Sequence, residues 1–366
     1  HANTVDSINE ITNIENKRIP GSVTLTKYDK DDPDHTALSG AEYALYRSDG
    51  TRVAITKAGS SYSYAETGKD STCVTGKDGT LTVSGLPWGN YYFLEVKAPV
   101  GYELNEKEVT FSIGKDQYDS LTNTIHTEIS QEDKQKPASI RLTKMDEEDG
   151  KLLKNAYYDV YVRKGNKWQK AYESLKTNAA GELIIDNLKF GDYRFVEIMP
   201  PVGYELDSTP MDTTLNASTA GSIVDILQTD ERKTGAVRLM KTSIDDVPLS
   251  NAEFSLYQKA DDPDDDMLIM SELTTGADGT TDVVDDLTWG EYYFKETSAP
   301  TGYQISDEKI PVSVNAKNVS IVQTIKASNN RILGSVMLTK MDEATKSKKL
   351  SEAEFSLFRS DGTLVK

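Results

Sequence analysis

The stretch YYFLEVKAPVGY, residues 91–102, has the alternation of a β-strand that runs into a turn. Glu95 shares one face of this strand with the preceding tyrosine and phenylalanine rings, where a β-domain buries apolar side chains. The same arrangement returns as YRFVEIMPPVGY at 193–204 and as YYFKETSAPTGY at 292–303. The chain therefore repeats one β-unit three times, each time with a carboxylate on the inward face.

Further segments recur in the same order around this stretch. Near copies of one opening strand are GSVTLTKYD at 21–29, ASIRLTKMD at 138–146, GAVRLMKTS at 235–243 and GSVMLTKMD at 334–342. The alternating segments are short and bounded by Gly, Asp, Asn and Pro, and none has a convincing helical period. Because the units repeat, the sequence predicts an all-β array in which each repeat is a β-sandwich.

The repeats divide the chain into five predicted segments. They are 1–16 for the last strand of a preceding domain, 17–134 for domain 1, 135–231 for domain 2, 232–330 for domain 3 and 331–366 for the N-terminal part of a further domain. Because the first and last segments match only part of a repeat, we expect the chain to be a piece of a longer array.

Composition excludes several classes of protein. Asp and Glu outnumber Lys and Arg by 59 to 41, and the resulting net charge of −18 disfavours nucleic acid and anionic membranes as partners. No apolar run approaches the roughly 20 residues of a membrane helix, and residues 1–20 lack a signal-peptide pattern. The single cysteine, Cys73, cannot form a disulfide within the chain. The three histidines have no metal-ligand or catalytic-triad spacing, so we expect no metal, no cofactor and no enzyme active site.

Charged and amide residues recur on the inward faces of the opening and closing strands. The opening-strand lysines are Lys27, Lys144, Lys241 and Lys340. The closing-strand residues are Asp133, Asp230, Asn329 and, ahead of domain 1, Asn16. Each closing residue precedes the next lysine by the same 11 positions (27 − 16, 144 − 133, 241 − 230, 340 − 329).

Taken singly, such residues have ordinary explanations. A lone lysine on an apolar face usually extends its ammonium group to the rim, and a lone Asp or Asn near a strand end usually caps a turn. Here lysine, glutamate and Asp or Asn recur together on the expected first, penultimate and last strands. Because an isolated buried charge is costly unless it is paired, we expect the three residue types to meet inside each sandwich.

The combined motif resembles a known family. LTK…D at the start, GxYxFxExxxPxGY in the middle and a closing Asn or Asp are similar to the B-type repeats of the collagen adhesin (Cna-B domains) of Gram-positive adhesins and pilins. The resemblance covers nearly the whole chain. It implies tandem inverse-immunoglobulin, transthyretin-like β-sandwich domains, located extracellularly at the cell wall of a Gram-positive bacterium. Many members of that family form an intramolecular isopeptide bond between the lysine and the Asn or Asp, assisted by an acid.

The resemblance assigns a role to each recurrent residue. It implies crosslinks from Lys27 to Asp133, from Lys144 to Asp230 and from Lys241 to Asn329, with Glu95, Glu197 and Glu296 as proton shuttles. Asn16 is then the acceptor of the preceding domain, and Lys340 the nucleophile of the domain that begins at 331.

The residue types suit this chemistry on physical grounds. Lysine attacks a carbonyl carbon only as the neutral amine, and burial favours that form because it penalises the charge. Burial also keeps a glutamate protonated, so that it can donate a hydrogen bond to the acceptor and carry the amine proton to the leaving group. An aspartate acceptor releases water and an asparagine acceptor releases ammonia. The reaction is a single self-modification and not catalysis on a substrate.

Two functions remain open at this stage. The first is a structural stalk of a surface adhesin or pilus, with neighbouring pilin subunits as partners. The second is a ligand-binding module in which the long, Tyr-rich loop 58–76 of domain 1 recognises a host or extracellular-matrix ligand. An aromatic groove found in domain 1 alone would favour the second.

Two local features leave further questions. The extra proline in IMPP (198–201) of domain 2 is expected to shift the turn beside Glu197. The acidic loops 29–35 and 261–266 offer oxygen ligands that suit calcium, but they lack the EF-hand order of residues. Solvated acidic turns are the simpler interpretation of both loops.

Overall fold

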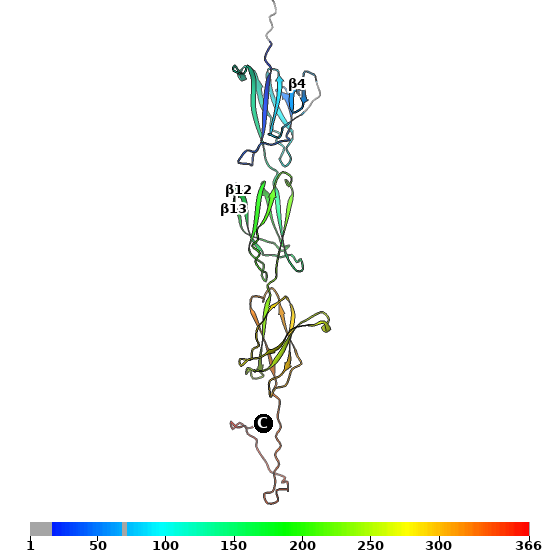
Figure 1. Ribbon diagram of the computed structural model, residues 1–366, viewed down its shortest axis with the longest axis vertical. Coiled ribbons are helices and arrows are strands. Elements are labelled where there is room, and N and C mark those ends of the chain that lie inside the picture. Colours follow the sequence, from blue (N-terminus) through cyan, green and yellow to red (C-terminus); the bar gives the residue numbers. More distant parts are fainter. Residues whose placement is uncertain (1–16, 68–71, 366) are drawn as a thin grey trace, which may run out of the picture. The chain divides into compact units, whose positions relative to one another are not determined.

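The structure is a computed structural model that describes residues 17–67 and 72–365. The described residues form 24 β-strands and two short 3-10 helices, and they contain no α-helix. The strands fall into three consecutive sets, and each set makes a sandwich of two sheets (Figure 1). The predicted all-β fold of tandem sandwiches is therefore confirmed.

Domain 1 has a six-stranded sheet in the order β3-β4-β6-β1-β10-β9 and a four-stranded sheet in the order β5-β2-β7-β8. Its elements are β1 (Gly21–Asp29), β2 (Glu42–Arg47), β3 (Ile55–Ala58), β4 (Ser61–Tyr64), β5 (Cys73–Val74), β6 (Thr80–Leu86), β7 (Gly89–Lys97), β8 (Val109–Ile113), η1 (Lys115–Gln117), β9 (Tyr118–Asp119) and β10 (Thr124–Asp133).

Domain 2 has a three-stranded sheet, β14-β11-β17, and a four-stranded sheet, β13-β12-β15-β16. Its strands are β11 (Ala138–Asp146), β12 (Tyr157–Lys164), β13 (Lys167–Lys176), β14 (Glu182–Leu188), β15 (Gly191–Met199), β16 (Met211–Leu215) and β17 (Ile223–Asp230).

Domain 3 repeats this plan, with the sheets β21-β18-β24 and β20-β19-β22-β23. Its elements are β18 (Gly235–Ser243), β19 (Glu253–Gln258), η2 (Pro263–Asp265), β20 (Met267–Thr274), β21 (Val284–Leu287), β22 (Gly290–Ser298), β23 (Lys309–Val314) and β24 (Val322–Asn329).

The first and last strands of each domain lie side by side and parallel. β1 pairs with β10, β11 with β17 and β18 with β24. In domain 1 the Cα of Lys27 lies opposite Gln131, and that of Asp29 lies opposite Asp133. Because successive side chains alternate between the faces of a strand, Lys27 and Asp133 point to the same side of the sheet. The register is the same in the other two domains, so each lysine lies close to the predicted acceptor of its own domain.

The inward face of the first strand is a row of apolar residues that ends in the lysine. In β1 buried and partly exposed residues alternate without a break, and Val23, Leu25 and Lys27 are fully buried. The aliphatic members of this row pack against Tyr43 and Phe93 of the opposite sheet. The lysine is therefore held at the edge of a core to which both sheets contribute.

The strand that carries the glutamate is not the penultimate strand, and this expectation was wrong. A further strand, β8, β16 or β23, pairs antiparallel with the glutamate strand before the chain reaches the last strand. These strands have five or six residues and lie at the edge of their sheet, so their alternation is too brief to stand out in the sequence.

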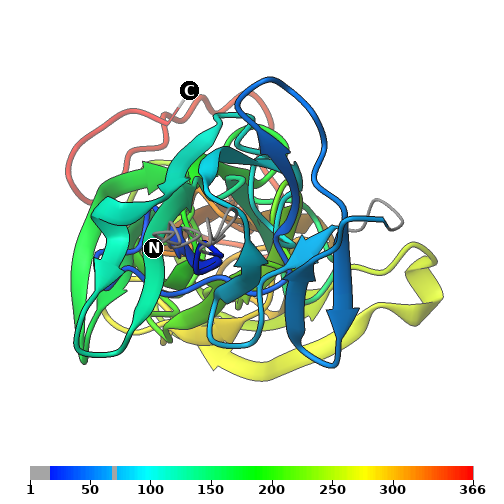
Figure 2. The same ribbon diagram turned by 90° about the horizontal axis from the view of Figure 1, so that it is seen from above.

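The long segment of domain 1 adds a hairpin to the larger sheet. β3 and β4 pair antiparallel, and β4 joins β6 in parallel through Tyr62 and Val83; the hairpin can be followed in blue in Figure 2. Tyr62 is 3% exposed, and its hydroxyl accepts a hydrogen bond from the backbone N–H of Val74 at 2.9 Å. The segment expected to be a loop thus contributes a ring to the core.

Residues 331–365 form isolated bridges but none of the named strands. Val336 and Leu338, which match the buried aliphatics of the other opening strands, are 77% and 61% exposed. In domains 1 to 3 the opening strand lies between two partner strands, and within the described residues 334–342 has no such neighbours.

Candidate functional site

Each domain buries one lysine, one glutamate and one Asp or Asn in a single cluster. The lysine comes from the first strand, the acceptor from the last strand beside it, and the glutamate from β7, β15 or β22 in the opposite sheet. All nine side chains belong to residues that are at most 3% exposed. The clusters are Lys27, Glu95 and Asp133; Lys144, Glu197 and Asp230; and Lys241, Glu296 and Asn329.

In domain 1 the lysine contacts both acids. Nζ of Lys27 lies 3.1 Å from Oε1 of Glu95 and contacts Oδ1 of Asp133. The two acids also interact with each other. The second oxygen of Glu95 accepts a hydrogen bond from the backbone N–H of Asn105 at 2.9 Å. One oxygen of Glu95 is thus held by the backbone, and the other faces the amine of Lys27 beside the carboxyl group of Asp133.

Domain 2 has the same cluster. Nζ of Lys144 lies 3.4 Å from Oε1 of Glu197 and contacts Oδ1 of Asp230. The second oxygen of Glu197 accepts from the backbone N–H of Asp207 at 3.1 Å. Glu197 therefore has the same two sets of contacts as its counterpart in domain 1.

The extra proline of domain 2 does not shift the turn beside Glu197. The backbone N–H of Tyr204 donates to the carbonyl of Pro201 at 3.2 Å. The corresponding bond in domain 1 runs from Tyr102 to Pro99 at 3.1 Å. The turn closes on the second proline of the pair, and the first proline precedes it without changing its hydrogen bond.

Domain 3 differs because its acceptor is an amide. Nζ of Lys241 lies 3.2 Å from Oε1 of Glu296. The side-chain nitrogen of Asn329 donates to both oxygens of Glu296, at 2.9 and 3.1 Å. The glutamate therefore lies between the amine and the nitrogen that would leave as ammonia.

Burial sets the protonation of these clusters. It raises the pKa of Glu95 and of Glu197 to about 7 in each case, against the opposing effect of the nearby lysine. Burial likewise raises the pKa of Asp133 and Asp230, and it lowers that of Lys241. In domains 1 and 2 burial thus favours the protonated acids, and in domain 3 it favours the neutral amine; amide formation requires both forms.

Uncharged residues complete the cluster of domain 1. Oε1 of Gln131 accepts hydrogen bonds from Nζ of Lys27 at 2.8 Å and from the hydroxyl of Tyr43 at 2.7 Å. The sequence pattern points to neither Gln131 nor Tyr43, since neither carries a charge. The available signal was the difference between repeats, in which Tyr43 and Gln131 correspond to Tyr158 and Gln228 of domain 2 and to Phe254 and Ala327 of domain 3.

A comparison with known families identifies these domains. The model of the SpaA prealbumin-like fold domain matches three stretches of the chain, 21–127, 138–229 and 235–329. The chain belongs to the SpaA prealbumin-like domain family. Each match begins with the opening strand of one sandwich, and together they cover most of the sequence. The resemblance to tandem Cna-B repeats is thereby confirmed.

The solved structures that match this chain share little sequence with it. The Bacillus anthracis TIE protein is 21% identical to this chain, with a TM-score of 0.45. The match covers 85% of this chain and 51% of the TIE protein, so this chain spans about half the length of that protein. The streptococcal ancillary pilin is 19% identical over 86% and 99%, with a TM-score of 0.27. BcpA, the major pilin subunit of Bacillus cereus, is 16% identical over 86% and 100%, with a TM-score of 0.30. No curated protein is a significant match.

Two predicted site residues are not among the three clusters described above. Asn16 lies outside the described residues. Lys340 is exposed, in the segment after the third SpaA domain that has no named strand. Their predicted roles therefore have no geometry to support them.

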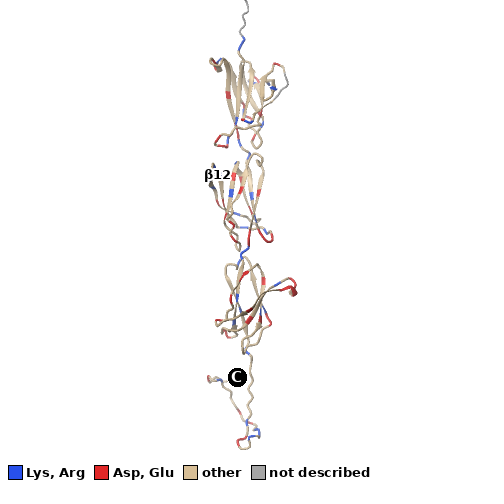
Figure 3. Ribbon diagram, in the orientation of Figure 1, with Lys and Arg blue, Asp and Glu red and all other residues tan. Residues whose placement is uncertain are grey.

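The acidic loops use their carboxylates within the protein. Asp32 accepts backbone hydrogen bonds from Asp34 and Thr36 of its own turn. The acidic loop of the third SpaA domain stands out in red in Figure 3. Asp266 of this loop accepts a hydrogen bond from the hydroxyl of Tyr293 at 2.9 Å and pairs with Lys309 at 3.0 Å. No group of three or more His, Cys, Asp or Glu in the described part of the chain is arranged to hold a metal ion. Nor does any helix there have the length and apolar character needed to cross a membrane.

Proposed function

We propose that the chain is a structural segment of a stalk, in an adhesin or a pilus on the surface of a Gram-positive bacterium. In this proposal an isopeptide bond between the first and last strands locks each unit (17–134, 135–231 and 232–330). The observation that carries the proposal is the buried triad of lysine, glutamate and Asp or Asn, which occurs three times between the same strands.

Charge pairing alone does not account for the triads. Domains 1 and 2 each bury two acids against one lysine, which leaves one acid more than an ion pair needs. Burying a second carboxylate is costly, so a domain selected only for stability would replace it with an apolar residue. The second acid has a purpose if it moves protons between the lysine and the acceptor.

The reaction in domain 1 balances without any added reagent. Transfer of one proton from the ammonium of Lys27 to Asp133 gives a neutral amine and a carboxylic acid. Nζ then attacks Cγ of Asp133, the C–N bond forms and the C–O bond breaks. Glu95 takes a proton from the nitrogen and delivers one to the departing hydroxyl, which leaves as water. Folding supplies the effective concentration of the two groups.

The other two domains follow the same scheme. In domain 2 Lys144, Glu197 and Asp230 play the same parts and release water. In domain 3 Nδ2 of Asn329 leaves as ammonia, and Glu296 already contacts that nitrogen and the attacking amine. Each domain reacts once, with itself, so the chain does not act on an external substrate.

A ligand-binding role for residues 58–76 has weaker support. The buried Tyr62 of this segment belongs to the core of domain 1, as described above, and its hydroxyl bonds to the backbone of the same segment. A recognition surface needs such rings to be exposed. Partners in this proposal are therefore neighbouring subunits of a stalk, and recognition of a host ligand is the alternative.

Replacing Glu95 with Gln tests the proposed chemistry. The amide keeps the shape of the side chain but does not shuttle protons, so we expect the domain 1 bond to form about 10²- to 10⁴-fold more slowly. Tryptic digestion and mass spectrometry, done as soon as the Lys144–Asp230 and Lys241–Asn329 branches have formed, should find little of the Lys27–Asp133 branch. A Lys27–Asp133 branch formed at the wild-type rate in this variant would show that Glu95 is not the shuttle.

A further inference from the structure

The side-chain amide of Gln131 has only one orientation that satisfies its surroundings. Its nitrogen donates to the backbone carbonyls of Asn105 and Lys107, at 3.3 and 2.7 Å, and these groups can only accept. Its oxygen must therefore face the opposite way, toward Lys27 and Tyr43. With both ends of the amide engaged, Gln131 holds its carbonyl at a fixed point beside the lysine.

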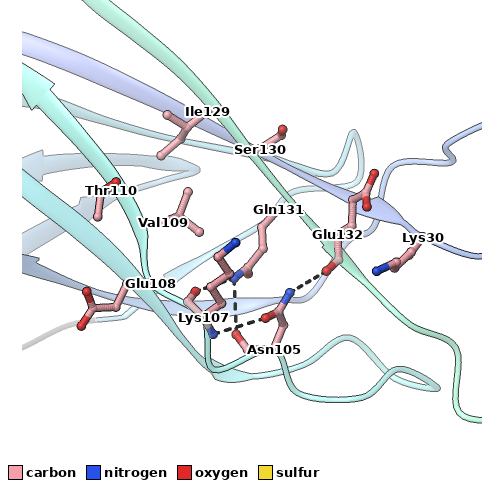
Figure 4. Close-up of a pocket in the computed structure, with 10 residues that line it drawn as sticks. All are labelled: Lys30, Asn105, Lys107, Glu108, Val109, Thr110, Ile129, Ser130, Gln131 and Glu132. Carbon is pink, nitrogen blue, oxygen red and sulfur yellow. Dashed lines mark hydrogen bonds between the residues drawn. The ribbon is translucent and has the colours of Figure 1, made fainter.

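Gln131 also separates the buried cluster from an open groove. The groove runs between β8 and β10, has a cavity volume of about 610 Å³ and is lined in part by Gln131. Figure 4 shows Gln131 extending toward Asn105 and Lys107. Gln131 is 7% exposed, whereas Lys27 on its inner side is fully buried. The lysine thus has a neutral hydrogen-bond acceptor on the side where water would otherwise approach.

The contacts of Lys27 define the direction of its lone pair. A neutral amine has two N–H bonds and one lone pair. Gln131 at 2.8 Å and Glu95 at 3.1 Å supply acceptors for the two N–H bonds, and the third neighbour of Nζ is the carboxyl of Asp133. When both N–H bonds are occupied, the lone pair is left to point at Asp133. After the reaction the carbonyl of Gln131 can accept the single N–H of the new amide.

The tyrosine and glutamine occur together in the two domains whose acceptor is an aspartate, and not in the domain whose acceptor is an asparagine. Domain 2, which also has an aspartate acceptor, keeps the hydrogen bond from the hydroxyl of Tyr158 to Oε1 of Gln228 at 2.7 Å. Domain 3, with its asparagine acceptor, has Phe254 and Ala327 at these positions. There the amine of Lys241 lies 5.3 Å from the centre of the Phe254 ring. A ring face attracts the amine only weakly and a methyl group offers it no acceptor, so among the described residues Glu296 is the side chain whose oxygen pairs with this amine.

We propose that Gln131, oriented by Tyr43, is a positioning residue that aims the amine of Lys27 at an aspartate acceptor, and that the apolar pair Phe254 and Ala327 suits an asparagine acceptor. This inference rests on the proposed isopeptide chemistry. An aspartate cluster contains one more ionisable group than an asparagine cluster, and its ammonium is attracted to both acids. A neutral carbonyl holds one N–H without adding charge, whereas an amide acceptor leaves the amine with a single acidic partner.

The loss-of-function test replaces Gln131 with Met, which keeps nearly the same shape and removes the carbonyl. The chain is made by cell-free translation, stopped in denaturant at set times and digested, and the branched peptides are counted. We expect the Lys27–Asp133 branch to form about 10- to 100-fold more slowly, as for misaligned reactants in general. Tyr43→Phe should slow it less, because it removes only one of the contacts that hold the glutamine.

Two internal controls accompany this test. The Lys241–Asn329 branch of the same molecules reports translation and folding, and its rate should not change. Gln228→Met should slow domain 2 less than Gln131→Met slows domain 1, because Lys144 donates to the backbone carbonyl of Thr229 at 3.5 Å and Gln228 bonds to Tyr158 and Asp207. Wild-type rates in Gln131→Met, with a normal branch in wild type, would overturn the positioning role alone. Absence of the branch in wild type would overturn the proposed function.

A gain-of-function test separates positioning from packing. Asn329→Asp alone gives domain 3 an aspartate acceptor without a positioning pair, and its branch should form slowly. Adding Phe254→Tyr and Ala327→Gln should restore the rate by about tenfold or more. If Tyr43 and Gln131 only filled space, adding their counterparts to domain 3 would not speed the reaction. An unchanged rate in the triple variant would therefore contradict the proposal, even if every Gln131 variant failed to fold.

Discussion

Pulling the chain from its two ends is expected to give no domain-sized lengthening from the three sandwiches before the attachment breaks. Force enters each domain at its first strand and leaves at its last strand, and the proposed bond joins those two strands. The load then bypasses the 106 residues from Lys27 to Asp133 (133 − 27). Hydrogen bonds between strands yield under load, and a covalent bond does not.

Lys27→Ala should restore one lengthening event in single-molecule force spectroscopy. At about 3.3–3.6 Å per residue, the released segment adds about 350–380 Å of extended chain. Because this variant leaves two acids without their cation, Glu95→Gln serves as the matched variant that keeps the lysine and Asp133 in place. Both should release the same length. Full unfolding steps from the unmodified domains would contradict the stalk mechanism.

Raising the pH should slow bond formation in domains 1 and 2 and have a smaller effect on domain 3. In the reactive cluster of domain 1 the amine is neutral and both acids are protonated. This form carries the same number of protons as an ion pair of Lys27 and Asp133 beside a protonated Glu95. Burial raises the pKa of Glu95 to about 7, so the cluster holds this proton below pH 7 and loses it above. Above that pH the rate should fall about tenfold per pH unit, because the reactive fraction falls by that factor.

Domain 3 supplies the comparison within the same molecule. Asn329 has no proton to lose. The reactive form of its cluster, a neutral Lys241 beside a protonated Glu296, carries the same number of protons as the ion pair of these two residues, so no extra proton is needed. Timed quenching of freshly translated chain at about pH 6, 7, 8 and 9, followed by digestion, measures all three branches together. Equal pH profiles for the aspartate and asparagine domains would contradict the assigned protonation states.

The charged part of the site could be predicted from the sequence because strand geometry is simple. Lys27, Glu95 and Asp133 each continue a row of apolar residues with a period of two, and that alternation fixes the face of the strand on which they lie. Because the same arrangement recurs in three repeats, each repeat supports the assignment of the corresponding residues in the other two. The distances between the three side chains depend on parallel pairing of β1 with β10, which the sequence alone did not indicate.

The remaining features lacked a local signal. Gln131 and Tyr43 are uncharged, and each has a common role in a strand, so their pairing with Lys27 depends on contacts across the two sheets. The polar, Tyr-rich sequence at 58–76 predicts a loop, whereas Tyr62 lies in a hairpin and is buried. Edge strands such as β8 are short, and one of their faces is polar. In these places tertiary contacts, and not local pattern, determine the structure.

The intact mass of the purified chain tests the central claim most directly. In the proposed reaction each aspartate domain loses one water when its bond forms, and the asparagine domain loses one ammonia. We expect the chain to be lighter than its sequence by two waters and one ammonia, and Lys27→Ala to lack one of the two water losses once the substitution itself is allowed for. A mass equal to that of the unmodified sequence would contradict the account, because three buried triads without bonds would leave the stalk unlocked.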